Sequence, residues 1–87
     1  MSADAERRAR VALDVAHEQD RQREKWGEQN HDARTWALIL GEEVGEVSRA
    51  ILAELFGGMG NVREELVQVA AVACSWIECI DRREEAR

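Results

Sequence analysis

Acidic side chains gather at two places in the chain, at spacings that place them on shared helix faces. The first is Glu42-Glu43-x-x-Glu46, and in the second Glu65 is followed three residues later by Gln68. Residues three and four apart are neighbours on a helix, where like charges repel by a few tenths of a kcal/mol per pair. Mg²⁺ prefers oxygen ligands of this kind. We therefore predict one divalent-metal site built from Glu43, Glu46 and Glu65, with the amide oxygen of Gln68 as a further ligand.

The alternative is that these glutamates form a solvated helix face without a ligand. Against this, the first cluster is interleaved with Leu40, Val44 and Val47, so at least one carboxylate faces inward and needs a partner. A zinc site is not expected. Cys74 and Cys79 lie far along the third predicted helix, and the two histidines belong to other segments.

Three helices are expected to position these side chains, at about residues 3–25, 33–56 and 62–84. The chain has no proline, and the glycine-containing segments 27–31 and 57–60 break the helical pattern. Asp32 or Asn30 is a suitable N-cap for the second helix. Asn61 followed by Glu64 resembles a capping box at the start of the third helix. Arg82 and Arg83 suit the C-terminal end of that helix.

The third helix is apolar on almost every side between Val67 and Ile77. Such a helix must be buried on every side, and two other short helices can hardly surround it. We therefore predict an all-α fold, a single domain over residues 1–87, in which a bundle of about three helices per chain is completed by homodimerisation. Gly45, inside the second helix, would leave room for a close neighbour or a ligand.

Composition narrows the classes of partner. The net charge of -6 argues against binding of polymeric nucleic acid. No apolar run approaches the length of a membrane span, and no signal peptide is visible, so we expect a cytoplasmic protein without a membrane partner. Cys74 and Cys79 are five residues apart in one helical segment and are expected to remain free thiols.

The acidic motifs belong to a longer pattern. Glu42-Glu43-x-x-Glu46, eighteen further residues and Glu65-x-x-Gln68 resemble the EExxE…ExxD signature of the MazG-like all-α nucleoside triphosphate pyrophosphohydrolases. The segments 25–31 (KWGEQNH), 41–47 (GEEVGEV) and 63–66 (REEL), together with Trp36, are similar to short phage and bacterial members. The likeness covers about residues 19–81.

This resemblance implies a helical bundle that forms a homodimer or a dimer of dimers and hydrolyses NTPs or dNTPs. The products are the nucleoside monophosphate and pyrophosphate, a house-cleaning reaction on the nucleotide pool. It implies Mg²⁺, or Mn²⁺, held by Glu43, Glu46, Glu65 and Gln68, with Glu42 and Glu43 as catalytic carboxylates. The family's last aspartate is Gln68 here, which supplies an oxygen without a charge. The alternative is therefore a non-catalytic helical dimer that binds nucleotide or a protein partner.

Five further residues are candidates for substrate binding: Lys25, Trp26, His31, Trp36 and Arg63. Trp26 and Trp36 could stack on a nucleobase or pack in the core. His31 could contact substrate or serve the loop before the second helix. Lys25 and Arg63 could meet phosphates or remain on the solvated surface.

Overall fold

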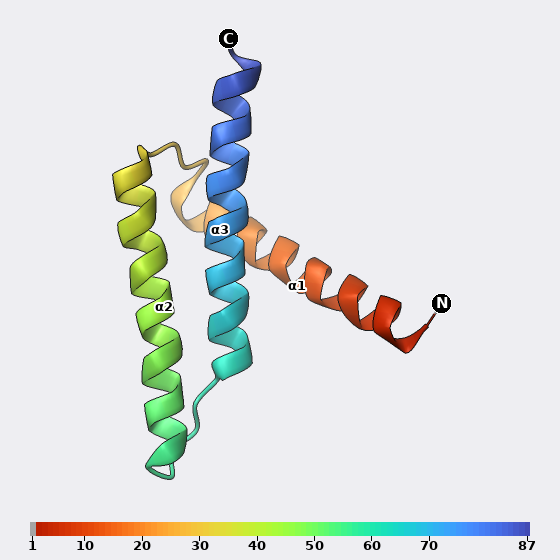
Figure 1. The fold of residues 1–87 in the computed structure, drawn as a ribbon, viewed down its shortest axis with the longest axis vertical. Helices are drawn as coiled ribbons and strands as arrows, with labels where there is room; N and C mark the ends of the chain where they lie inside the picture. Colours follow the sequence, from red (N-terminus) through yellow and green to blue (C-terminus); the bar gives the residue numbers. More distant parts are fainter. Residues whose placement is uncertain (1) are drawn as a thin grey trace.

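The computed structural model describes residues 2–87, and the regular structure in this range is entirely helical (Figure 1). The helices are α1, Ala3–Trp26, α2, Ala33–Leu55, and α3, Val62–Glu85. The all-α class and the three helices are confirmed, and each predicted range differs from the observed one by a single residue at its C-terminal end.

Side chains start the first two helices, and the third starts differently. Ser2 Oγ accepts a hydrogen bond from the Ala5 amide at 3.1 Å, and Asp32 Oδ1 accepts one from the Thr35 amide at 2.8 Å. Asn61 is the N-cap of α3, but its side chain makes no capping hydrogen bond. Its ψ of 63° departs from the extended backbone, at ψ 159° and 167°, of the other two caps. The predicted capping box is therefore wrong.

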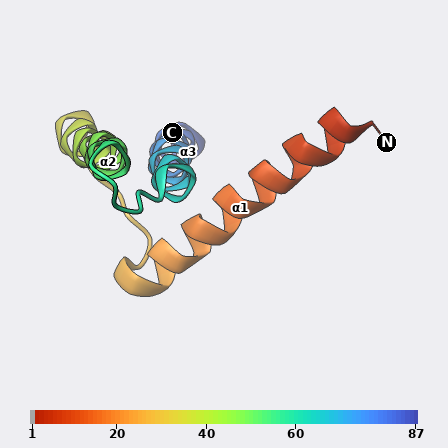
Figure 2. The same cartoon turned by 90° about the horizontal axis from the view of Figure 1, so that it is seen from below.

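Helix α3 is the common partner of the other two. α2 and α3 run antiparallel beside one another, while α1 crosses α3 and extends away from the pair (Figures 1 and 2). Within residues 2–87, α1 and α2 each pack on α3 but not on one another. The core is small: Trp36, which is 1% exposed, packs with Val72 and Cys79 between α2 and α3.

The loop between α1 and α2 is fastened to the last turns of α3. Arg82 forms an ion pair with Glu28 at 2.6 Å and donates to the Gln29 carbonyl at 3.1 Å. Arg83 donates a hydrogen bond to the His31 carbonyl. Charged donors to carbonyl and carboxylate oxygens make strong hydrogen bonds. Arg82 and Arg83 therefore fasten the loop that carries His31 to the end of α3. They also lie in the last turn of α3, where positive charge suits the helix terminus.

A single chain does not cover α3 on every side. Leu66, Ile77 and Ile80 remain about half exposed. Cys74 and Cys79 are both free, as predicted. Within the described range, none of the helices combines the length and the apolar character needed to span a lipid bilayer.

The turn between α2 and α3 depends on a glycine. A methyl group added at Gly60 would lie 1.9 Å from the Ala50 carbonyl oxygen, whereas one added at Gly58 would lie 3.1 Å from that of Ala53. We expect Gly60→Ala to destabilise the fold by about 1–3 kcal/mol. The new methyl group would clash with the backbone carbonyl of Ala50, which cannot move aside as a flexible side chain would. Thermal unfolding measures this change, with Gly58→Ala as the milder control. Equal melting temperatures for the two variants would contradict the observed packing of this turn.

Candidate functional site

Glu43 is the centre of an acidic cluster formed by α1, α2 and α3. Burial raises the pKa of Glu43 above its usual value, and the nearby carboxylates of Glu65, Glu46, Glu18 and Glu42 raise it further, in that order. Its Oε2 atom is buried and has no hydrogen-bond partner. A buried carboxylate oxygen without a donor, surrounded by negative charge, is costly in the absence of a cation.

The donor set of this cluster suits a hard cation, although its side chains are spread in the observed conformation. Within residues 2–87, no three carboxylate, imidazole or thiol groups converge closely enough to form a ready-made metal site. Glu46 instead lies 3.6 Å from Arg49. Glutamate and glutamine oxygens, with one oxygen of Glu43 left unpaired, are the ligand chemistry of Mg²⁺ rather than of zinc.

Glu18 is a member of this cluster that the sequence motifs did not indicate. It lies on α1 with a side chain only 12% exposed, and Arg21 binds it through two hydrogen bonds, Nε to Oε1 at 2.8 Å and Nη2 to Oε2 at 2.7 Å. Those bonds hold the pKa of Glu18 below its usual value. The only sequence signal was the Glu–Arg spacing of three on α1, which is also typical of an ordinary surface pair.

An open cavity of about 760 Å³ lies beside the cluster. Five predicted site residues line it: Trp26, His31, Glu42, Glu43 and Gln68. Its remaining lining comes from α1, the α1–α2 loop and the core, namely Glu18, Arg21, Gln22, Glu28, Gln29, Asn30, Ile39 and Val72. The cavity therefore joins an acidic end to a tryptophan and a polar loop.

Two of the other predicted metal ligands lie near Glu43 without lining the cavity. Glu46 and Glu65 are close enough to raise the pKa of Glu43, yet neither side chain forms part of the cavity wall. The structure thus brings the predicted carboxylates into one electrostatic neighbourhood. It does not bring them into mutual contact.

The predicted substrate-binding residues divide between the cavity and other places. Trp26 is 58% exposed, and the Lys25 ammonium lies over its ring at 4.6 Å. Trp36 is a core residue, stacked with Trp76 at 6.4 Å between ring centroids and touched edge-on by His31. Its packing role therefore leaves no free face for a base.

Arg63 lies outside this cavity. It forms an ion pair with Asp14 at 2.7 Å and lines a separate surface hollow with Asn61 and Glu64. Arg63 therefore ties the start of α3 to α1 and does not line the cavity beside Glu43.

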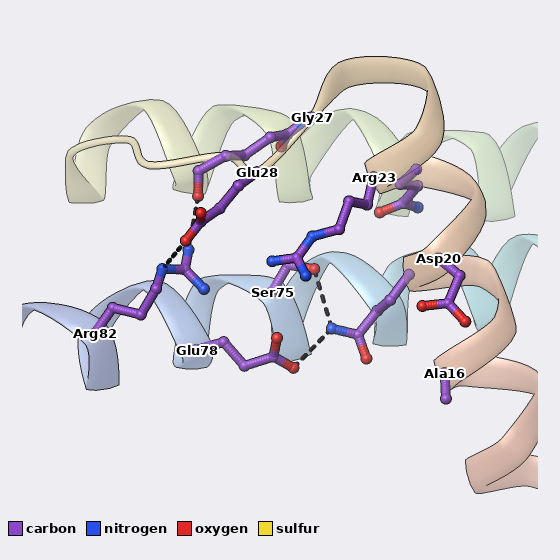
Figure 3. A pocket seen from close by; sticks show the side chains of 11 residues that line it. Ala16, Asp20, Arg23, Gly27, Glu28, Ser75, Glu78 and Arg82 are labelled. Carbon is purple, nitrogen blue, oxygen red and sulfur yellow. Dashed lines mark hydrogen bonds and ion pairs between the residues drawn. The ribbon is translucent and has the colours of Figure 1, made fainter.

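A second, smaller cavity of about 230 Å³ lies where α1 meets α3 (Figure 3). Gln19 crosses it, donating to Ser75 Oγ at 3.2 Å and to Glu78 Oε2 at 2.8 Å. The ion pair between Arg82 and Glu28 closes one side. The contacts of Gln19 with Ser75 and Glu78 link α1 to α3 across this cavity.

Comparison of the chain with models of protein families, with curated proteins and with solved structures finds no match. The resemblance to the MazG-like enzymes therefore rests on the motif residues themselves.

The crowding of charge at Glu43 predicts a stabilising substitution. Because the folded state raises the pKa of Glu43, the folded protein binds this proton more tightly than the unfolded chain, and stability falls as the pH rises through that pKa. We expect Glu43→Gln to stabilise the metal-free protein at neutral pH by a few tenths of a kcal/mol per like-charge neighbour removed. The gain disappears once the pH falls below the usual pKa of glutamate.

Thermal melts in the presence of a chelator, at neutral and at acidic pH, measure this effect. Glu42→Gln is the matched control, since Glu42 is adjacent in sequence but exposed. A Glu43→Gln variant that is less stable than wild type at neutral pH would show that Glu43 has a favourable partner in the metal-free fold.

Proposed function

We propose that this protein is a Mg²⁺-dependent nucleoside triphosphate pyrophosphohydrolase of the MazG-like type. The observation that supports it most is the unpaired, half-buried Glu43 among four other carboxylates at the edge of an open cavity. Repulsion of this kind lowers stability unless a cation offsets it. The cluster consists of the carboxylates of the two acidic motifs and of Glu18 from α1.

The proposed roles combine the family resemblance with the positions of the residues. Glu43, Glu46 and Glu65, with the Gln68 amide oxygen, would hold the ion, and Mn²⁺ could replace Mg²⁺. A bound Mg²⁺ supplies charge neutralisation for the triphosphate and for the transition state. Glu42, which is exposed and lines the cavity, would accept a proton from the water that attacks the α-phosphorus. The nucleoside monophosphate and pyrophosphate are then the products.

The other end of the cavity suits a nucleoside. Trp26 is 58% exposed and lines this end of the cavity, and a base can stack on the ring face that Lys25 does not cover. Gln29, Asn30 and His31 line the same space on a loop that α3 holds in place. Amide and imidazole groups on a fixed loop can hydrogen-bond the edge of a base.

The direct test is incubation with a panel of NTPs and dNTPs plus Mg²⁺, followed by detection of released pyrophosphate. We expect turnover that Glu43→Ala abolishes, because that substitution removes the central carboxylate. Glu84→Ala, at the far end of α3, is the control and should retain full activity. Nucleotide binding without turnover in the wild type would favour the non-catalytic alternative, while neither binding nor turnover would contradict both.

Gln68 provides a second test of the site. Its side chain lines the cavity where the family has an aspartate. We expect Gln68→Asp to tighten Mg²⁺ binding, since it exchanges a neutral oxygen for a charged one. Calorimetric titration measures the affinity, and an unchanged value would place Gln68 outside the metal's ligands.

We also propose that the protein is a homodimer, joined through the side of the α2–α3 pair opposite α1. On α2, apolar and small residues recur at spacings of four and three, and on α3 the same spacing continues. This back face consists of Ala37, Gly41, Val44, Ser48, Ile51 and Leu55 on α2 and of Leu66, Ala70, Ala73, Ile77 and Ile80 on α3.

The back face supports pairing with another copy for two reasons. Its large members are about half or more exposed in the single chain. Its four-three spacing is that of helices that pack at a shallow angle in four-helix bundles. Ser75 and Glu78 of α3 contact Gln19 of α1, and Ile77 points to the opposite side of that helix. A second copy bound there would leave the acidic cavity open.

Ile51→Glu is expected to convert the dimer into monomers, because it places a charge in the middle of the back face. Val11→Glu is the matched control on α1, since the two side chains have nearly the same exposed fraction, 45% and 44%. Light scattering after size-exclusion chromatography measures the mass. A wild-type monomer, or an Ile51→Glu dimer, would contradict this interface.

A further inference from the structure

Arg21 is the only arginine or lysine among the described side chains that line the acidic cavity. It lies on α1, opposite the α2 residues Glu42 and Glu43. Glu43 and Glu64 are near enough to raise the pKa of Arg21, after the larger effect of Glu18. A cation at this position is therefore within the field of the proposed metal site.

Glu18 holds the Arg21 side chain in one orientation. The carboxylate accepts from Nε at 2.8 Å and from Nη2 at 2.7 Å, and Gln22 donates to the same carboxylate at 3.0 Å. Within residues 2–87 these are the hydrogen bonds of the Arg21 guanidinium, so Nη1 and the second Nη2 hydrogen stay available. A guanidinium fixed along one edge presents its other donors without a large loss of side-chain entropy.

A triphosphate entering this cavity meets mostly negative charge. A metal ion among the glutamates would reduce the repulsion between this negative charge and the phosphates. Binding of the phosphates also requires a positively charged side chain that is not tied to the metal's own ligands. A planar guanidinium fits the spacing of two phosphate oxygens. The cations predicted from the sequence do not meet this need, since Lys25 lies over Trp26 and Arg63 is paired with Asp14 outside the cavity.

We propose that Arg21 binds the phosphate groups of the nucleotide and that Glu18 is a positioning residue that orients Arg21 for this contact. The proposal rests on the function proposed above and adds the residue that distinguishes a triphosphate from an uncharged nucleoside. The ligand class is a polyphosphate monoester, bound with its phosphates between Arg21 and the acidic cluster and its base toward Trp26.

The test is calorimetric titration of the Mg²⁺-loaded protein with α,β-methylene nucleoside triphosphates, which resist cleavage at the proposed position. We expect Arg21→Gln to lower the affinity for the analogue that the wild type binds most tightly by about 10- to 100-fold. This is the usual range for the loss of a charged hydrogen bond. Binding of Mg²⁺ alone and of the matching nucleoside should change little. Arg7→Gln is the matched control, because Arg7 pairs with Asp4 on the same helix at the same spacing, far from the cavity.

The positioning role of Glu18 is tested by a double-mutant cycle. We expect Glu18→Gln to weaken triphosphate binding in the wild-type background and to have little further effect when Arg21 is already glutamine. A purely structural role would lower the melting temperature and the affinities for nucleoside and triphosphate together. Equal effects of Glu18→Gln in both backgrounds would overturn the positioning role.

The outcomes separate this proposal from the proposed function. If the wild type binds no triphosphate analogue, the proposed function fails. If it binds the analogue and Arg21→Gln binds it equally well, the function stands and the role of Arg21 is overturned.

Discussion

The cavity of the candidate site depends on α3, because within residues 2–87 α1 and α2 each pack on this helix and not on one another. Glu18 of α1 and Glu43 of α2 line one cavity together with Gln68 and Val72 of this helix. The loop that carries His31 is tied to the same helix through Arg82 and Arg83. A small core of Trp36, Val72 and Cys79 keeps α2 in register with α3. Fixing α3 against its two neighbours therefore fixes the cavity.

The acidic cluster imposes a cost that the fold alone does not offset. Burial and four like charges raise the pKa of Glu43, and one of its oxygens has no donor. A chain this short has little stability to spare, since small domains bury a modest share of their surface. Groups with perturbed pKa values cluster at functional sites. A divalent cation and a second copy of the chain would each supply what the single chain lacks.

The helices were predictable because their signals are local. Glycine-containing breaks, the Asp32 cap and the three-four spacing of apolar residues gave the bounds to within one residue. The acidic motifs likewise gave Glu42, Glu43 and Gln68, which line the cavity. These features depend on neighbours close in sequence.

What the sequence did not reveal depends on how α1 crosses α3. Glu18 and Arg21 have the spacing of a routine surface pair, and only the crossing angle brings them to Glu43. The same crossing takes Arg63 to Asp14, away from the cavity. The core position of Trp36 depends on how α2 packs on α3. The missing cap at Asn61 depends on the backbone angle of that residue. Neither can be predicted from composition.

The central claim is that the cluster around Glu43 binds a divalent cation. Electron paramagnetic resonance of Mn²⁺ titrated with the protein measures this directly, because bound ions lose the sharp signal of the free ion. The account predicts saturable binding by the wild type, competition by Mg²⁺ and a marked loss of binding in Glu65→Gln, with Glu78→Gln unchanged. Mn²⁺ that stays free at millimolar protein, or equal binding by both variants, would contradict it.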